Sequence, residues 1–378
     1  MDFAFSEEQD ALRSLAREIL TGEVTPELLK EVEAGPHFHH PGLWSALAEA
    51  NLLGLAVPEE LSGMGFGLLE VCVLLEETGR EVAPVPVLPT LVLGGLAIER
   101  CGSEAQKKAW LEPMAAGDAI LTAALSEPRS EDPTSPQTEA RREGGDWILE
   151  GVKQRVPAAA LARRILTPAR TGEGVGIFLV DPEAKGVSLT SQRLTNREPV
   201  YELELSGVRV PEEDLLGGDV AAGARALGWL RDCALVGTCA IQLGVSSRAL
   251  EITTDYAKER EQFGAPIGSF PAVQQRAADC FVDLEAMRVT LWHAAWKLHR
   301  GQEAPREAMV AKYWAAEAGA RIASSAQHLH GGIGVDFDYP IHRYFIWSKS
   351  LELAFGGASL QLARLGHDMA RSGPQESL

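Results

Sequence analysis

The first 120 residues carry apolar side chains at helical spacing. Ser6 and Gln9 form a capping-box pattern. Apolar positions then recur every three or four residues, at Leu12, Leu15, Ala16 and Ile19. Thr25-Pro26 predicts the start of a second helix, because proline suits the first helical position. Two further helices are expected, one around Leu43, Leu47 and Leu52 and one from Leu68 to Arg80.

From about Ile120 the pattern changes to short β-prone runs separated by turn residues. These runs are Ile120 to Leu125, Trp147 to Val152, Ile177 to Val180, Val187 to Leu189 and Val200 to Leu205. The polar stretch from Arg129 to Gly145 is rich in Pro, Ser and Glu, which predicts a surface loop.

Helical periodicity returns at Ala221 and continues to the end of the chain. Four long amphipathic stretches are expected, at Ala221 to Arg260, Phe270 to Arg300, Pro305 to His328 and Ile346 to Arg371. Helices, then strands, then long helices indicate an α+β protein. We predict an N-terminal helical domain over 1–120, a middle β domain over 121–220 and a C-terminal helical bundle over 221–378.

Composition restricts the classes of function. With 46% hydrophobic and 23% charged residues, the 378-residue chain is typical of a soluble globular protein. Its net charge of −18 argues against nucleic acid and anionic membrane surfaces as partners. The apolar stretch from Ala234 to Val245 is too short to span a bilayer, and the start lacks a signal-peptide pattern. We therefore expect a cytoplasmic protein. The five scattered cysteines are interpreted as buried hydrophobes, and neither a disulfide frame nor a zinc site is expected.

Two segments of the last third could contact a phosphate-bearing cofactor. The first is Arg260-Glu261-Gln262-Phe263-Gly264-Ala265-Pro266-Ile267-Gly268. An arginine where a helix becomes a loop can hold a phosphate bidentately, and Phe263 can cover a ring. The second is His330-Gly331-Gly332-Ile333-Gly334, where glycine allows close backbone approach. By residue type alone, a surface arginine, a core phenylalanine and a plain turn are the simpler alternatives.

Together these segments resemble the two C-terminal signatures of the acyl-CoA dehydrogenase flavoproteins, and the resemblance covers essentially the whole chain. It implies an N-terminal helical domain, a middle β-barrel or sandwich and a C-terminal four-helix bundle. It also implies FAD, an acyl-CoA substrate from fatty acid or sterol side-chain metabolism, an electron-transfer flavoprotein and assembly into oligomers. The residues it assigns to FAD are Arg260, Phe263, Gln327, His328, Gly331, Gly332, Gly334, Leu125 and Ser126.

Several positions depart from the family pattern. Leu125-Ser126-Glu127-Pro128 resembles the family's threonine-glutamate-proline turn, but Glu131 and Asp132 stand where a Gly-Ser pair would follow. Arg155 and Pro157 replace the tryptophan and threonine that pack on the flavin ring.

The general base is also missing from its usual places. The two positions where the family keeps its catalytic glutamate are Phe355 and Ala234, and Leu235 replaces an arginine near the acyl-CoA. Glu352 and Asp232 are the neighbouring acids that could serve as a displaced base. Solvated or salt-bridged helix carboxylates are the simpler interpretation of both.

In the family, the arginine and glycine segments serve the FAD of a neighbouring subunit, whereas the glutamate and the flavin-packing residues serve the subunit's own. The chain keeps the first set and lacks much of the second. It therefore resembles the degenerate partner subunit of a heteromeric acyl-CoA dehydrogenase. A self-sufficient homo-oligomer with a relocated base and a flavin-free binding or structural protein are the alternatives.

Two other groups of residues could bind a metal ion or a partner subunit. His37, His39 and His40 suggest a metal cluster, but they lie between prolines without a partner pattern, which favours an exposed loop and no metal. Trp292 and Trp296 lie four residues apart on a predicted helix and are most simply core or interface packing. With Leu291 and Trp314, they are expected to offer apolar surface that a partner subunit could bury.

Overall fold

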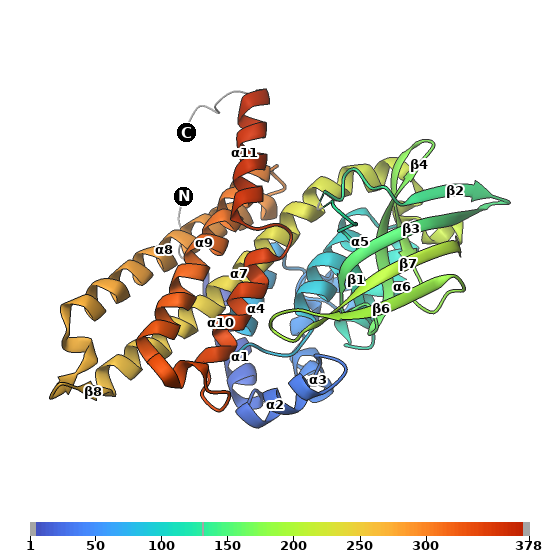
Figure 1. The fold of residues 1–378 in the computed structure, drawn as a ribbon. Coiled ribbons are helices and arrows are strands. Elements are labelled where there is room, and N and C mark those ends of the chain that lie inside the picture. The colour runs from blue at the N-terminus through green and yellow to red at the C-terminus, as the bar shows by residue number, and fades with distance from the viewer. Residues whose placement is uncertain (1–4, 131, 373–378) are drawn as a thin grey trace.

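The computed structural model describes residues 5–130 and 132–372. Helices build its N-terminal part (Figure 1). They are α1 (Glu7–Glu23), α2 (Pro26–Ala34), α3 (Pro41–Glu49), α4 (Leu68–Arg80), the π-helix η3 (Leu88–Gly95), α5 (Leu96–Cys101) and α6 (Glu104–Ala115). The 3-10 turns η1 (Leu52–Gly54) and η2 (Glu59–Leu61) link α3 to α4. The capping box is present, with Ser6 Oγ accepting from Gln9 N and Gln9 Oε1 accepting from Ser6 N.

One mixed sheet of seven strands forms the middle of the described chain. Its strands are β1 (Ile120–Ala123), β2 (Glu139–Glu143), β3 (Asp146–Pro157), β4 (Ala162–Thr171), β5 (Gly174–Val180), β6 (Val187–Arg193) and β7 (Pro199–Val210). The order is β1-β4-β2-β3-β7-β6, with β5 paired to β4. β1 and β2 run parallel to β4, and the other pairs are antiparallel. Its own core is built around Trp147 and Phe178.

The C-terminal part is a bundle of long helices. These are α7 (Val220–Glu259), α8 (Pro271–His299), α9 (Pro305–His330), α10 (Ile341–Leu353) and α11 (Ala358–Ser372). The short hairpin β8 (Glu261–Gln262) and β9 (Ala265–Pro266) and the turn η6 (Ile267–Ser269) connect α7 to α8, and η7 (Gly331–Val335) follows α9. The turns η4 (Glu212–Asp214) and η5 (Leu216–Gly218) precede α7.

The central helix α7 joins the three parts. Residues 232–247 are buried without interruption, because α4, α8, α9 and α10 all pack around this segment. The central part of α7 is therefore enclosed on all sides, where the sequence predicted an amphipathic helix, whereas both ends of α7 carry exposed residues. By length and composition α7 could cross a bilayer, but 89% of its most apolar window is buried inside the protein.

The fold corrects several expectations. The predicted loop from Arg129 to Gly145 contains strand β2, and strand β4 was not predicted. The predicted helix from Ile346 to Arg371 is two helices, α10 and α11, because the chain turns at residues 354–357. Phe355 has φ 53° and Gly356 φ 97°, and neither value fits a continuous helix.

Candidate functional site

A cavity of about 260 Å³ lies where the middle sheet meets the bundle. Three groups of elements line it. Ser126 follows β1, and Arg155 and Pro157 belong to β3. Thr238 and Ile241 lie on α7, Trp347 and Leu351 on α10, and Phe355 on the turn before α11. The loop between β6 and β7 closes it with Asn196 and Glu198. The structure thus brings Ser126, Arg155, Pro157 and Phe355 to one cavity.

The turn that carries Phe355 is tightly held from both sides. Gln361 Nε2 donates to Phe355 O at 3.2 Å and to Gly356 O at 3.0 Å. Lys312, which is fully buried, donates from Nζ to the carbonyl oxygens of Leu351 and Glu352 at 3.0 and 2.9 Å. These bonds satisfy carbonyl groups that the end of α10 would leave unpaired. A side chain at position 355 therefore lies at the cavity wall in a defined place.

Neither of the neighbouring acids lines this cavity. Glu352 pairs with Lys349 at 2.5 Å, and Asp232 pairs with Arg231 at 2.9 Å. Burial raises the pKa of Asp232, while Arg231 opposes the shift. Ala234 is buried in the core, one turn of α7 before Thr238. Both carboxylates thus fit the simpler interpretation, in which helix acids form ion pairs.

The turn after β1 is fixed by Glu127. Its Oε1 accepts from Lys153 Nζ at 2.7 Å and from Thr138 Oγ1 at 2.6 Å, and its Oε2 accepts from Gln137 N at 2.6 Å. Burial opposes ionisation, but Lys153 and these hydrogen bonds lower the pKa of Glu127. The network anchors Ser126, whose carbonyl accepts from Gln154 N at 2.9 Å. Leu125 is buried in the core, 5% exposed, and does not line the cavity.

The flavin-facing side of this cavity does not fit a flavin well. Arg155 takes the place of a flat packing side chain and has φ 52°, a strained value for a residue with a Cβ atom. The Asp132 carboxylate accepts hydrogen bonds from Thr134 N and Thr134 Oγ1, at 3.1 and 2.7 Å, and an ionised carboxylate has no hydrogen to donate to a phosphate. Glu131 lies outside the described residues.

Glu198 is the cavity residue that sequence reasoning missed. It follows Asn196 in the loop before β7, and burial raises the pKa of its carboxyl group. No spacing or motif in the sequence connects this loop with Phe355, so only the folded chain reveals it. The sequence analysis missed Lys312 as well. A lysine among the alanines of α9 could have indicated a buried charge that binds polar groups inside the protein.

The arginine segment forms the free tip of the bundle. α7 ends at Glu259, and Arg260 N still donates to Tyr256 O at 2.8 Å. The β8–β9 hairpin then turns at Phe263, which has φ 57° and is 96% exposed. Both residues therefore project from the tip, where they can meet another molecule.

The glycine segment lies at the same end of the bundle. His330 stacks on Tyr256 with ring centroids 4.5 Å apart, which joins the end of α9 to the end of α7. Gly331 has φ 62°, and a Cβ atom added there would meet open space. Gly332 is likewise exposed and open. Backbone amides in such a turn can approach a phosphate closely.

The amide side chain expected near the adenine is used inside the chain. Gln327 Nε2 donates to Gly334 O at 2.5 Å, and Gly334 is buried against it. His328 is exposed on α9. Of the two, only His328 is free to face a ligand at the surface.

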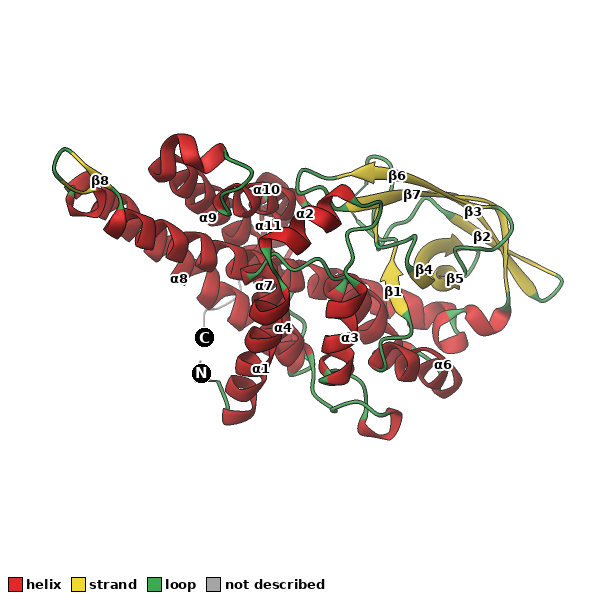
Figure 2. Ribbon diagram, turned by 90° about the horizontal axis from the view of Figure 1, so that it is seen from below, coloured by secondary structure: helices red, strands yellow, loops and turns green. Residues whose placement is uncertain are grey.

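The two halves of the expected flavin site lie at opposite ends of the molecule. Figure 1 and Figure 2 both show the β8 hairpin at the end of the bundle that points away from the sheet. Arg260 and Gly331 at the tip and Ser126 and Arg155 at the sheet therefore cannot reach one flavin within one chain. The tip has the donors and open backbone that fit a flavin dinucleotide, and the sheet side does not.

The expectation of a partner surface on the long helices is corrected. Leu291 and Trp292 are buried, 1% and 7% exposed, and Trp292 packs on Phe5. They do not offer surface for a partner, and Trp296 and Trp314 are only partly exposed. The exposed apolar side chains of α8 are instead Phe281, Val282 and Val289.

The histidine segment is only partly an exposed loop. His39 is half-buried beside Trp44, and burial lowers its pKa to about 4. His40 Nδ1 accepts from Leu43 N at 3.0 Å and caps α3. Across the described residues, no three His, Cys, Asp or Glu side chains are grouped so that they could hold a metal ion.

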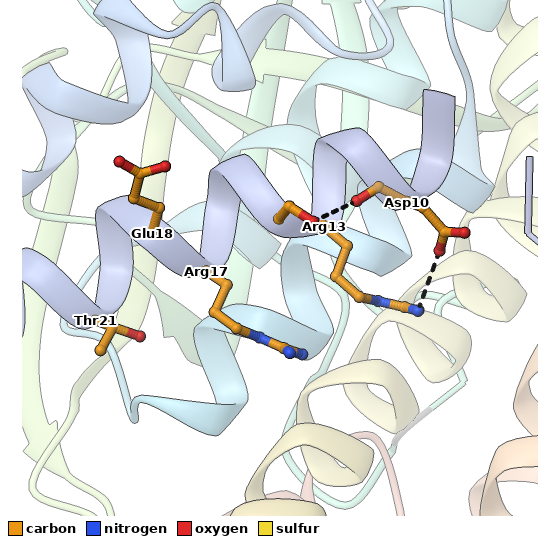
Figure 3. A pocket seen from close by; sticks show the side chains of 6 residues that line it. Asp10, Arg13, Arg17, Glu18 and Thr21 are labelled. Atoms are coloured by element: carbon orange, nitrogen blue, oxygen red, sulfur yellow. Dashed lines mark hydrogen bonds and ion pairs between the residues drawn. The ribbon is translucent and has the colours of Figure 1, made fainter. Parts of the chain in front are cut away.

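A shallow hollow on α1 is a packing feature. Figure 3 shows Arg13 and Arg17 extended from the helix, with Arg13 paired to Asp10. Their other partners are the buried carboxylates of α4, because Arg13 reaches Glu76 at 3.4 Å and Arg17 reaches Glu77 at 2.8 Å. These arginines fasten α1 to α4.

Comparison with known proteins identifies the family of the N-terminal and C-terminal parts. Residues 6–118 match the model of the acyl-CoA dehydrogenase N-terminal domain, and residues 223–369 match that of the acyl-CoA dehydrogenase C-terminal domain. Acyl-CoA dehydrogenase FadE27 of Mycobacterium tuberculosis is 39% identical, over 98% of this chain and 100% of that protein.

Similar solved structures include two that carry the names of two proteins together. A chain of the Tcur3481-Tcur3483 steroid ACAD is 44% identical with a TM-score of 0.90, covering 97% of this chain and 98% of that one. A chain of the ChsE4-ChsE5 complex from Mycobacterium tuberculosis is 37% identical with a TM-score of 0.93, covering 99% and 100%. A glutaryl-CoA dehydrogenase of Mycobacterium smegmatis, 25% identical, was solved with FADH2. This chain belongs to the acyl-CoA dehydrogenase family, whose members are FAD-dependent oxidoreductases acting on CH–CH bonds of acyl-CoA thioesters.

Proposed function

We propose that this chain is the partner subunit of a heteromeric acyl-CoA dehydrogenase. It gives its tip, with Arg260, Phe263 and the open turn at Gly331 and Gly332, to an FAD held by a related but non-identical chain. The observation that carries the proposal is the contrast between the two ends of the molecule. The tip keeps Arg260 and an open backbone, while the cavity at the sheet has Phe355 where a base would stand, and the carboxylate of Asp132 stands where the family's phosphate contact would follow.

Two similar structures support a two-chain assembly, because one is of a ChsE4-ChsE5 complex and the other of a Tcur3481-Tcur3483 steroid ACAD. The substrate of the assembly is then an acyl-CoA, with a bulky sterol-like acyl group as the favoured class. Its electrons pass to an electron-transfer flavoprotein, and we expect the assembly in the cytoplasm.

The flavin stoichiometry of the purified heteromer tests the proposal. The chain is co-expressed with the acyl-CoA dehydrogenase encoded beside it, and mass and flavin absorbance are measured on the complex. About one FAD per pair of chains is expected. A homotetramer that carries one FAD per chain would favour the self-sufficient enzyme, and a stable assembly without FAD would favour a binding or structural protein.

A further inference from the structure

Most of the cavity beside Phe355 is apolar, and most of its polar side chains already have partners. Thr78 and Thr238 each donate their hydroxyl to a carbonyl oxygen of their own helix at 2.8 Å. Ser350 Oγ donates to Asn196 Oδ1 at 3.1 Å. These groups are satisfied within the chain, so they do not require a ligand.

Glu198 is the acid among the residues that line this cavity, and its side chain is half-buried. Within residues 5–130 and 132–372, its carboxylate accepts one hydrogen bond, from Asn196 Nδ2 at 3.3 Å, and forms no ion pair. The more deeply buried acids are better compensated. Five of them have a basic group within 4.0 Å, namely Glu33, Glu76, Glu77, Glu127 and Asp232. The sixth, Glu70, accepts from Gln9 Nε2 at 2.7 Å and from Gly67 N at 3.0 Å.

A carboxylate at the wall of an apolar cavity is costly unless donors compensate it. The burial that raises the pKa of Glu198 reports this cost. Perturbed, unpaired acids in clefts are over-represented at functional sites. Here the missing donor would come most simply from a molecule inside the cavity.

We propose that this cavity binds a compact apolar molecule whose hydroxyl or amino group donates to the Glu198 carboxylate. The volume of about 260 Å³ is just below that of sites for drug-sized ligands, so it suits one ring or the end of a longer chain. The apolar walls are supplied by residues such as Val87, Ile241, Trp347 and Phe355. The proposal rests on the proposed function in one respect, namely that this chain does not hold a flavin ring of its own there.

Matched probes on one ring test the chemistry of recognition. Cyclohexylmethanol and cyclohexylmethylamine carry a donor, whereas cyclohexylmethyl methyl ether keeps the ring and oxygen and lacks it. Calorimetric titration of the purified chain at pH 8 should show the donor probes binding at least about tenfold more tightly than the ether. The two donor probes distinguish an alcohol ligand from an amine.

Variants test whether the preference for donor probes arises at Glu198. Glu198→Leu should bring the preference for donors close to unity, and Glu198→Gln should weaken the amine more than the alcohol. Glu204→Gln, an exposed position on the same strand region, should change nothing. Phe355→Trp should weaken all three probes by filling the cavity.

Three results would overturn the proposal: equal binding of ether and alcohol, a preference that survives in Glu198→Leu, or no binding of any probe at millimolar concentration. These results are independent of the flavin count. A heteromer with two FAD per pair contradicts the proposed function, whatever the probes do.

Discussion

At the scale of single residues, one buried lysine supports the turn that carries Phe355. Lys312 is fully buried, yet it binds carbonyl oxygens instead of a carboxylate. It closes the end of α10 directly before the turn that carries Phe355. The chain thus holds position 355 firmly, at the place where the family resemblance leads one to expect a glutamate.

Replacing this lysine should loosen that turn. In Lys312→Met the chain length and most of the volume remain, but two helix-end carbonyls lose their donor. We expect a loss of about 1–3 kcal/mol in the free energy of unfolding, measured by denaturant titration. Lys349→Met, which removes a more exposed pair on α10, is the control and should cost less than 1 kcal/mol. Equal stability of the two variants would mean that the buried bonds contribute little.

The same lysine should also make the stability of the chain depend on pH. Burial lowers the pKa of Lys312 from 10.5 to about 8. Between these values the unfolded chain binds more protons than the folded chain, so the folded state gains stability as pH rises. The stability of the wild-type chain relative to Lys312→Met should therefore increase from pH 8 to pH 10. A constant difference over this range would show that Lys312 titrates normally.

For Glu198 we predict the opposite dependence of stability on pH. Its raised pKa means that the folded chain binds more protons than the unfolded chain above pH 4.5, so stability is lost as pH rises through this window. Glu198→Gln should raise the melting temperature at pH 8, with a smaller gain near pH 5. Arg155 shares the cavity with Glu198, and His37 and Tyr201 share a neighbouring crevice. Glu198→Gln in an Arg155→Gln background tests whether that arginine modulates the effect.

At the scale of elements, the sequence predicted those whose signals are local. The capping box of α1 and the bounds of α4 are confirmed, because caps and apolar periodicity act within a few residues. Strand β2 is mostly charged and was missed, because it exists through pairing with β3. The break between α10 and α11 had a signal in Gly356-Gly357, but Gln361 and Lys312 complete it from distant positions.

The tip hairpin is the element whose function is most easily tested. Arg260→Ala should release FAD from the heteromer while the chain stays folded, because one charge-assisted contact is lost. We expect flavin to bind about 10- to 100-fold more weakly, measured by titrating FAD into the apo-complex. Lys258→Ala removes another exposed cation near the end of α7 and should leave affinity unchanged. Identical affinity in both variants would make Arg260 a plain surface cation.

At the scale of the whole molecule, the sequence predicted which residues belong to the site but not how they are arranged in space. Motif residues at the tip and at the sheet could be recognised one by one in the sequence. That they lie at opposite ends of one chain depends on the length and packing of α7, which no motif encodes. The carboxylate of Glu198 likewise enters the cavity only because the loop before β7 meets the end of α10.

Because the two groups of motif residues lie at opposite ends of the molecule, we predict that the chain alone does not dehydrogenate an acyl-CoA. Phe355 and Ala234 supply no carboxylate, and loss of a general base costs roughly 10²- to 10⁴-fold in rate. Turnover is measured on the pure chain, supplied with FAD and an artificial electron acceptor, beside the heteromer at equal concentration. We expect activity in the heteromer only. Phe355→Glu in the isolated chain should not restore turnover, because Arg155 and Asp132 still leave the flavin side unfit. Robust turnover by the pure chain that is abolished in Glu352→Gln, Asp232→Asn or Glu198→Gln would show instead that the base has moved to that residue.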